Sequence, residues 1–278
     1  MLNMKSVAIL LTVHNRKEKT YKCLNSVYKN IGKITEYDFD VYLTDDGSTD
    51  GTYTMVKENF SKVKIIKGNG NLFWCRGMYV AWKEACNTKD YDYYIWLNDD
   101  VELFDESLEN GIKLCNKVNN YAIITGAFRS KKNGDLTYGA KFIDDKKVGP
   151  NGKLQEIQIF FGNFIVVPNN VVKKIGIIDP TYKHAYGDND YSLRALKNNI
   201  KVYLMPEYVG YCEAHSYTEK YMDPKQSVKN RFKALYSPVY TPHDAFVYNY
   251  RYFSLFKALR IVLQLHIITL FPRLKNKK

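Results

Sequence analysis

Several features that would assign the sequence to a specialised class of protein are missing. The five cysteines are odd in number and scattered, and no two of them form a C-x-x-C pair. We therefore expect reduced, mostly buried thiols, as in a cytosolic protein. The N-terminus runs straight into an apolar stretch without the h-region of a signal peptide. No uninterrupted apolar run reaches the roughly 18–20 residues that span a bilayer. These absences predict a cytoplasmic protein.

The composition is that of a globular protein with a basic surface. A chain of 278 residues, 45% of them hydrophobic, can bury one core or one core plus a small second lobe. The net charge of +12 predicts an acidic partner, such as a nucleic acid, an anionic lipid or a phosphorylated small molecule. The lysines are dispersed and no zinc-knuckle or RNP-like string occurs, so no nucleic-acid partner is expected.

The most informative stretch runs from Tyr91 to Val101. An aromatic-rich apolar run, typical of a buried strand, ends abruptly at Asn98, Asp99 and Asp100. Carboxylates at the end of such a strand can bind Mg²⁺ or Mn²⁺ together with a substrate diphosphate, or accept hydrogen bonds from a sugar. Taken alone, an Asp-Asp pair of this kind is also typical of a solvated turn that caps the next helix.

The first hundred residues alternate between strands and helices. Apolar runs predict strands over residues 6–13, 39–44, 63–66 and 93–97. Amphipathic or capped segments between them predict helices, which favours an α/β sheet with helices on both faces. Each predicted strand is followed by a polar cluster, at residues 14–16, 45–50, 68–71 and 98–100. Ligands gather at the carboxyl ends of strands in such sheets, so these four clusters favour a binding site over independent turns.

The second half is expected to continue the same sheet. The pattern predicts a helix over 106–118 and strands over 121–127, 159–167, 201–205 and 208–212. Residues 128–158 are polar, glycine-rich and lysine-rich, and are expected to form hairpins or a mobile loop. Gly187, Asp188, Asn189 and Asp190 precede a helix whose first turn carries the acids, which suits the helix dipole.

From Tyr217 onward the sequence becomes basic and helical. Residues 250–271 have a wide apolar face and a narrow polar stripe, and the chain closes on basic residues. This pattern predicts one helix that lies in a membrane interface, attracted by anionic lipid. A helix packed on the core with a solvated basic end is the alternative interpretation.

Together these strings resemble the family-two inverting glycosyltransferases of GT-A fold, close to the bacterial rhamnosyltransferase- and galactofuranosyltransferase-like members. The matching strings are Val7 to Arg16, Thr44 to Thr52, Gly70 to Leu72, Leu97 to Val101 and Gly187 to Arg194. His215 falls where some members place a metal-binding histidine. The resemblance implies a Rossmann-like mixed α/β sheet flanked by helices, with a C-terminal helical basic amphipathic segment.

The resemblance also implies a domain organisation for the chain. Residues 1–216 would form the transferase domain, with a nucleotide-sugar half (1–100) and an acceptor half (101–216). Residues 217–278 would be a membrane-associating or oligomerising extension. The expected activity is inverting transfer of a sugar from a nucleoside-diphosphate sugar to a hydroxyl of a glycan or lipid-linked acceptor in cell-surface polysaccharide synthesis. The enzyme would act in the cytoplasm or at the cytoplasmic face of the membrane.

Roles for individual residues follow from their places in the family's motifs. The base and ribose would contact Thr12, Val13, Asn15, Arg16, Asp46 and Asn71, and Asp99 would contact the ribose or sugar. A divalent cation, Mn²⁺ or Mg²⁺, would be held by Asp100 and His215. Asp188 would be the catalytic base, and Asp190 and Arg194 would shape the acceptor site or support the acidic loop. One departure matters: Asn98 replaces the first acid of the D-x-D motif, and an amide oxygen is a weaker ligand for a hard cation.

Three other functions are less consistent with these motifs. Asp45-Asp46-Gly47 is similar to an aspartyl-phosphate phosphatase string, but its two acids are adjacent. A dehydrogenase is disfavoured because no G-x-G-x-x-G follows the first strand. A catalytically silent nucleotide-sugar or glycan-binding module would keep the acids of the nucleotide pocket but would need no base, and Asp188 argues against it.

Overall fold

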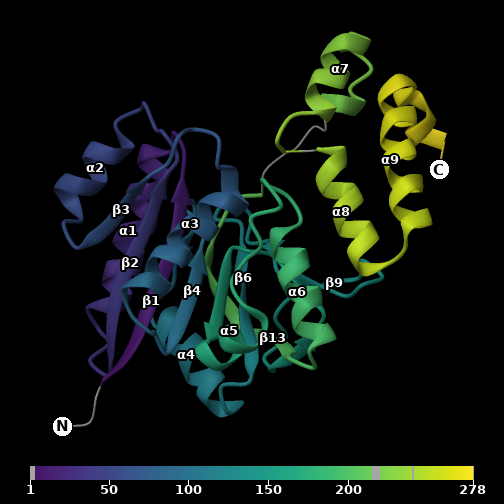
Figure 1. Ribbon diagram of the computed structural model, residues 1–278. Helices are drawn as coiled ribbons and strands as arrows, with labels where there is room; N and C mark the ends of the chain where they lie inside the picture. The colour runs from purple at the N-terminus through teal and green to yellow at the C-terminus, as the bar shows by residue number, and fades with distance from the viewer. Residues whose placement is uncertain (1–3, 215–219, 240, 278) are drawn as a thin grey trace.

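The computed structural model describes residues 4–214, 220–239 and 241–277. Its N-terminal half alternates strands and helices along one parallel sheet (Figure 1). The strands are β1 (Lys5–Val13), β2 (Tyr37–Asp45), β3 (Val63–Lys67) and β4 (Tyr93–Leu97), in the spatial order β4-β1-β2-β3. The connecting helices are α1 (Lys17–Ile31), α2 (Thr52–Asn59) and α3 (Phe73–Thr88). The predicted alternation is confirmed.

The second half extends this sheet with strands of both directions. β12 (Phe164–Pro168) pairs antiparallel with β4 and with β6 (Ala122–Arg129). β13 (Lys201–Tyr211) then runs parallel to β6, and β10 (Gln155–Ile157) closes that edge. β5 (Glu102–Leu103) and β7 (Leu136–Tyr138) add short pairings, and α4 (Ser107–Lys117) lies between β5 and β6 in the chain. The sheet is therefore mixed, as expected.

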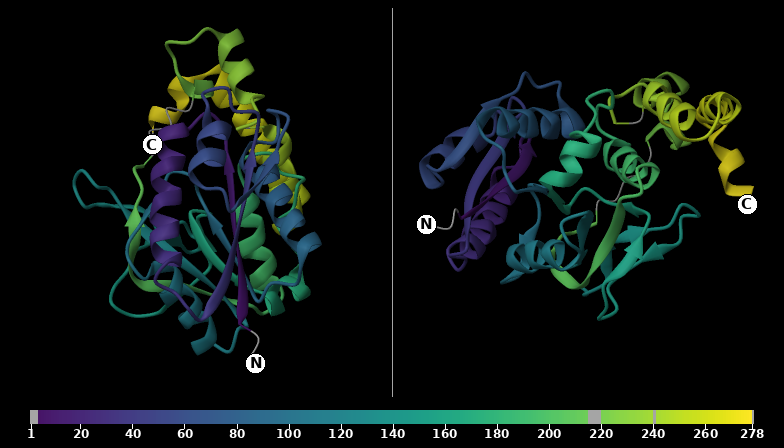
Figure 2. Two further views of the ribbon diagram at one scale, coloured as in Figure 1. Left: turned by 90° about the vertical axis from the view of Figure 1, so that its left-hand side faces the viewer. Right: turned by 60° about the horizontal axis from the view of Figure 1, so that its bottom comes forward.

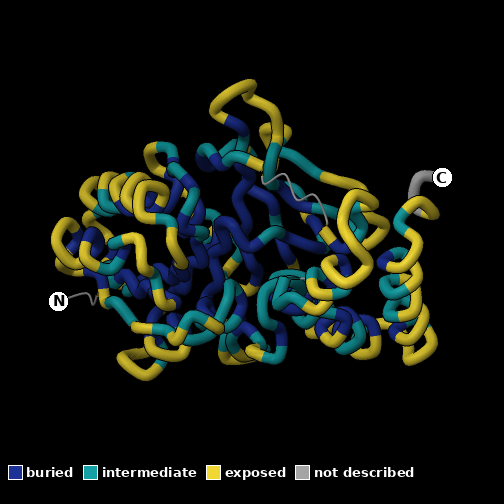
Figure 3. The backbone as a smooth tube through the Cα atoms, turned by 90° about the horizontal axis from the view of Figure 1, so that it is seen from above, coloured by how far each residue is buried: buried dark blue, intermediate teal, exposed yellow. Residues whose placement is uncertain are grey.

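The core has two layers because side chains alternate along the buried strands. In β1, Val7 and Ile9 pack on one face with α1 and α4, whereas Ala8 and Leu10 pack on the other with α3. The second layer also contains Tyr191 of α6 (Gly187–Lys197). Figure 3 shows the buried backbone running through the middle of the molecule, with exposed segments around it.

Two of the strand boundaries predicted from the sequence were wrong. The run 159–167 is not one strand: β11 (Ile159–Phe160) and β12 are separated by a turn whose Asn163 carbonyl accepts a hydrogen bond from Asn98 N at 3.2 Å. Conversely, 201–205 and 208–212 are joined into β13, which has two register shifts against β6. Residues 128–158 form the expected hairpins, in which β7 pairs with β6 and β8 (Ala140–Lys141) pairs with β9 (Lys147–Val148), and β11-β8-β9 make a separate small sheet.

The C-terminal region is a helical group at the side of the sheet away from β3 (Figures 1 and 2). It comprises η1 (Lys220–Met222), α7 (Val228–Leu235), α8 (Pro242–Tyr252), α9 (Leu255–Leu270) and η2 (Pro272–Lys277), with α5 (Asn169–Ile175) preceding α6 in the main body. The single helix predicted over 250–271 was wrong. The chain breaks at Phe253 and restarts at Ser254, whose hydroxyl accepts a hydrogen bond from Lys257 N at 3.1 Å.

Helix α3 approaches β1 so closely at Gly77 that we expect no larger residue to fit there. A Cβ at this position would collide with the Thr12 side chain, and the Gly77 carbonyl accepts a hydrogen bond from Thr44 Oγ1 at 2.9 Å. We expect overpacking in Gly77→Ala to cost about 1–3 kcal/mol. This cost should exceed the gain of about 1 kcal/mol in helix propensity, so the free energy of unfolding should fall. Urea denaturation measures the change.

Glu84→Ala, at an exposed position of the same helix, is the matched control and should change the free energy of unfolding by less than about 0.5 kcal/mol. A Gly77→Ala variant more stable than the wild type would contradict the predicted clash.

Candidate active site

The polar clusters that follow β1, β2 and β4 meet in one pocket of about 490 Å³. Turns from the second half of the chain complete its wall. The lining residues are Thr12, Val13, His14, Arg16, Asp46, Phe73, Trp74, Asn98, Asp99, Tyr138, Phe161, Gly162, Asn163, His184, Ala185, Tyr186, Asp188 and Asn189. The pocket therefore lies at the carboxyl edge of the parallel strands, where an open α/β sheet binds its ligands.

Asp46 organises the loop between β3 and α3. Its Oδ1 accepts a hydrogen bond from Gly70 N at 2.8 Å, and its Oδ2 accepts from Leu72 N and Phe73 N, both at 2.9 Å. The carboxylate is almost fully buried. Since each carboxylate oxygen can accept two hydrogen bonds, Oδ1 has one position left for a ligand.

Asp99 and Asp100 lie buried side by side just after β4. One guanidinium nitrogen of Arg16 bridges them, at 3.1 Å from Asp99 Oδ1 and 3.0 Å from Asp100 Oδ2, and Lys19 Nζ lies 3.7 Å from the same Asp100 oxygen. Burial raises the pKa of Asp99 to about 6, although Arg16 acts in the opposite direction. The pair thus concentrates negative charge where a cation is favoured.

Asn98 is engaged with an aromatic ring. Its Oδ1 accepts a hydrogen bond from Trp74 Nε1 at 2.8 Å. One lone pair of the amide oxygen at the first place of the D-x-D pattern therefore holds a side chain that lines the pocket.

Asp188 lies in the first turn of α6 and also lines the pocket. Its Oδ2 accepts a hydrogen bond from Gly162 N at 3.2 Å, and its Oδ1 accepts from Asn189 N at 2.8 Å. Burial raises the pKa of Asp188 above its ordinary value, while these hydrogen bonds act against the shift. A carboxylate of raised pKa at a ligand pocket suits proton abstraction.

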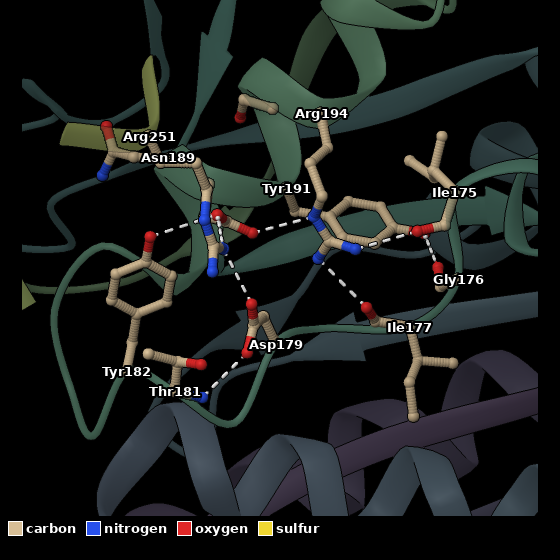
Figure 4. Close-up of polar contacts among 12 residues, drawn as sticks. Ile175, Gly176, Ile177, Asp179, Thr181, Tyr182, Asn189, Tyr191, Arg194 and Arg251 are labelled. Atoms are coloured by element: carbon tan, nitrogen blue, oxygen red, sulfur yellow. Dashed lines mark hydrogen bonds and ion pairs between the residues drawn. The ribbon is translucent and has the colours of Figure 1, made fainter. Parts of the chain in front are cut away.

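Asp190 is fully buried, is not among the lining residues of the pocket, and belongs to a polar network with Arg194 and Arg251, which Figure 4 labels. Its Oδ2 pairs with Arg194 Nε at 2.8 Å, and its Oδ1 pairs with Arg251 Nη1 at 2.8 Å. Tyr252 Oη donates to the same Oδ1 at 2.7 Å. Arg251 also pairs with Asp179 at 2.7 Å. Because Arg251 belongs to α8, this network joins the C-terminal helices to the helix that carries Asp188.

Two pocket residues have backbone conformations that are rare for side-chain-bearing residues. Phe73 has φ +58° and Tyr186 has φ +70°, and Asn15 beside the pocket has φ +50°. Such conformations cost about 1–3 kcal/mol each and persist where the surroundings impose them, often at functional sites. Here they turn the chain at the starts of α3 and α6.

The structure brings only part of the predicted site together. Thr12, Val13, Arg16, Asp46, Asp99 and Asp188 line the pocket. Asn15 accepts a hydrogen bond from Thr49 N at 2.7 Å, and Asn71 is exposed, so neither is among the lining residues in the described part of the chain. Asp100, Asp190 and Arg194 are not among the lining residues. His215 is outside the described residues.

The comparisons with known proteins decide the family. Residues 8–176, more than half of the chain, match the family described as Glycosyl transferase family 2. The chain belongs to glycosyl transferase family 2. The family match contains Asp46, Asn98 and Asp99 but ends before Asp188.

Two curated proteins are similar to this family member over most of its length. TarP of Staphylococcus aureus, a poly(ribitol-phosphate) β-N-acetylglucosaminyltransferase, is 22% identical over 85% of this chain and 72% of TarP. A glycosyltransferase of Rickettsia typhi is 24% identical over 67% of this chain, which spans 57% of the length of that protein.

Solved structures confirm the GT-A fold expected for the family. Residues 1–349 of S. aureus TarS match 99% of this chain and 73% of that chain, with a TM-score of 0.57 and 14% identity. The mannosyltransferase PcManGT of Pyrobaculum calidifontis, solved with GDP-Man and Mn²⁺, matches 96% of this chain and 70% of that chain, with a TM-score of 0.54 and 14% identity.

Several pocket residues of this family member were missed from sequence. They are mostly aromatic or amide side chains: Phe73, Trp74, Tyr138, Phe161, Asn163, His184 and Tyr186. Phe73 and Trp74 directly follow the Gly70-Asn71-Leu72 string, and Tyr186 directly precedes Gly187, so adjacency to the motifs could have indicated them. Tyr138 lies in the β6–β7 hairpin and Phe161 in the turn between β11 and β12, and neither segment carries a motif.

We expect the Asp190 carboxylate to stabilise the folded state of this transferase. Removing its carboxylate leaves the guanidinium groups of Arg194 and Arg251 without their shared partner inside the protein. We expect Asp190→Ala to lower the free energy of unfolding by about 3–5 kcal/mol, as for other broken buried ion pairs. Urea denaturation followed by circular dichroism measures it.

Asp90→Ala is the control, because the Asp90 side chain is 78% exposed, and it should change the free energy of unfolding by less than about 0.5 kcal/mol. A loss for Asp190→Ala no larger than the control's would show that the network does not stabilise the fold.

Proposed function

We propose that the protein transfers a sugar from a nucleoside-diphosphate sugar to a hydroxyl group of a glycan or lipid-linked acceptor, with inversion at the anomeric carbon. The observation that carries this proposal is that one pocket contains both Asp46 and Asp99, expected at the donor, and Asp188, expected at the acceptor hydroxyl. Its volume of about 490 Å³ is in the range of small-molecule sites.

The donor nucleotide would lie along the ends of β1 and β2. Thr12, Val13 and Arg16 offer backbone and side-chain contacts there, and the remaining lone pair of Asp46 Oδ1 can accept a hydrogen bond from a base N–H. Arg16, held by the two acids, presents positive charge to the diphosphate. Asn15 would act through the Ser48–Thr49 turn, because its side chain and backbone are both bonded there.

The buried acid pair fits a divalent cation. Mg²⁺ and Mn²⁺ are commonly held by one or two carboxylates together with substrate phosphates, and Asp99 and Asp100 supply two carboxylates at one strand end. Within the described residues no cluster of three acidic, His or Cys ligands occurs. Asp100, with His215, would hold the ion, which when bound neutralises charge on the departing diphosphate.

Asp188 would take the proton of the acceptor hydroxyl. As the acceptor oxygen bonds to the anomeric carbon, the bond from that carbon to the diphosphate oxygen breaks, and the proton passes to the Asp188 carboxylate. A single displacement of this kind inverts the anomeric centre. The hydrogen bonds from Gly162 N and Asn189 N orient the carboxylate for this transfer.

The acceptor is proposed to be a cell-surface glycan or its lipid-linked precursor. TarP, a relative that matches 85% of this chain, acts by its name on poly(ribitol-phosphate), a polymer of that kind. Acceptor contacts would come from Tyr138, Phe161 and Tyr186, the aromatic side of the pocket, because aromatic rings pack against sugar C–H groups.

Replacing Asp188 tests the proposed base. We expect Asp188→Asn to lower the transfer rate about 10²–10⁴-fold while leaving nucleotide-sugar binding intact. Because burial raises the pKa of Asp188, and only the ionised form accepts a proton, the wild-type rate should fall on the acid side at a pH above the ordinary Asp pKa of 3.8. A panel of nucleotide sugars, assayed for donor hydrolysis and transfer, measures both effects.

Asp90→Asn is the matched control, because the Asp90 side chain is far more exposed than that of Asp188, and it should retain the wild-type rate. Wild-type turnover by Asp188→Asn would refute the proposed base, and binding of nucleotide sugars without any turnover would favour a silent binding module.

We also propose that α9 lies on an anionic membrane surface. Its outward face is apolar, with exposed side chains at Phe256, Leu259, Leu263, Ile267 and Leu270. Ala258 and Thr269, on its inward face, are buried, and Arg231 of α7 donates to the Thr269 carbonyl at 2.7 Å. Exposed Arg260 and Arg273 add positive charge for lipid headgroups. Among the described helices none is long and apolar enough to cross a membrane.

Vesicle binding tests this surface in the intact chain, since α8 must stay in place for its contact with Asp190. We expect Leu263→Glu to reduce co-sedimentation with phosphatidylglycerol vesicles roughly tenfold, because the buried apolar contact is lost and a like charge is added. Wild-type binding should weaken with salt and be low on phosphatidylcholine alone.

Gln264→Glu adds the same charge to the polar stripe of α9 and should keep most of the binding. Equal losses from both variants would mean that charge alone is responsible. A change in the mass of Leu263→Glu in solution, with no vesicle binding by the wild type, would show that a second copy covers this face.

A further inference from the structure

Trp74 differs from the other two tryptophans in both exposure and bonding. Trp82 and Trp96 are fully buried in the core, and their indole N–H groups have no hydrogen-bond partner among the described residues. Trp74 is half-buried, lines the pocket, and donates its indole N–H to Asn98. Of the three rings it is therefore the one that a pocket ligand can touch.

The Trp74 ring is held at two points. Asn98 Oδ1 accepts its N–H at 2.8 Å, and the edge of its six-membered ring packs so closely on Gly162 that a Cβ there would collide with it. Trp96 meets it edge-on, with ring centroids 6.1 Å apart. A ring fixed in this way is pre-organised for a ligand, because little conformational freedom remains to be lost on binding.

The Trp74 ring contacts residues next to both the proposed donor site and the proposed base. Asn98 immediately precedes Asp99, on the donor side, and Gly162 N donates to Asp188 Oδ2, the proposed base. In the displacement proposed above, the transferred sugar must lie between the diphosphate and the base. Trp74 contacts residues on both sides of that place.

We propose that the indole of Trp74 is the platform on which the transferred pyranose ring lies, and that Asn98 is its positioning residue and not a cation ligand. This inference rests on the proposed function. Hexose rings carry a face of C–H groups that an aromatic face can bury. Among the lining residues, Trp74 has the largest aromatic side chain.

The replacement of the usual acid by Asn98 follows from this role. An amide oxygen accepts the indole N–H without adding charge. A third carboxylate here would stand beside Asp99 and Asp100, where two buried acids already share the Arg16 guanidinium. The amide therefore holds the ring while sparing the site a further like-charge repulsion.

Quenching of tryptophan fluorescence by acrylamide tests the platform without any turnover. Because Trp82 and Trp96 are buried, quenching reports on Trp74, and the Trp74→Phe variant should lose most of it. We expect UDP-N-acetylglucosamine or GDP-mannose, whichever the protein binds, to protect Trp74 at least twofold better than the matching nucleoside diphosphate alone.

A double-mutant cycle tests the role of Asn98. Losing the hydrogen bond that orients Trp74 should lower kcat/KM for the accepted donor about tenfold in Asn98→Ala. In the Trp74→Phe background, where no indole N–H remains, the same change should cost less than twofold, because the two residues act as a unit. Asn98→Asp, which keeps an acceptor oxygen, should retain wild-type quenching of Trp74.

Other outcomes would overturn the inference. Equal losses from Asn98→Ala in both backgrounds, with a higher Mn²⁺ concentration needed for half-maximal rate, would make Asn98 a cation ligand. Binding of a nucleotide sugar without protection of Trp74 would refute the platform and leave the proposed function standing. Failure to bind any nucleotide sugar in the panel, measured by calorimetry, would refute both. Trp82 and Trp96 stay shielded from acrylamide in any variant that folds. Their shielding therefore shows that each variant is folded.

Discussion

The burial of two adjacent carboxylates at one edge of the sheet is the constraint on which the site depends. Asp99 and Asp100 are both paired with the guanidinium of Arg16 at the start of α1, and Lys19 lies beside Asp100. Burial of unbalanced charge is costly, so the site needs either this cation or another in its place. The geometry of β1, α1 and the turn after β4 is therefore coupled to the charge that the pocket can accept.

A second buried acid gives the C-terminal helices a part in the site. Asp190 is fully buried and is paired with Arg194 of its own helix and Arg251 of α8. Since α6 carries Asp188 in the same turn, the position of the proposed base depends on a contact made some sixty residues later in the chain. A helix hairpin attached in this way can present its apolar face to a membrane without being separate from the transferase body.

Much of the site could be anticipated because its motifs follow strands. Asp46 and Asp99 each come directly after a strand whose pattern is clear, and strand ends of one parallel sheet must converge. Asp188 lies in the first turn of a helix that the sequence also predicts. The break of 159–167 and the aromatic wall could not be foreseen in the same way. Phe161 follows β11, whose partner is β8, and Tyr138 lies in β7, which pairs with β6 across a register shift. Local pattern does not encode the register of these pairings.

The strand–helix alternation, the acids at the carboxyl edge and the family can be predicted from the amino-acid sequence, because periodicity and short motifs are local properties. The use of those groups depends on the folded chain. The structure shows that Asp46 supports a loop, that Asn98 bonds to Trp74, and that Asp190 joins α6 to α8. The reason is that hydrogen-bond partners and burial depend on residues far apart in the chain, and these fix which polar group remains open to a ligand.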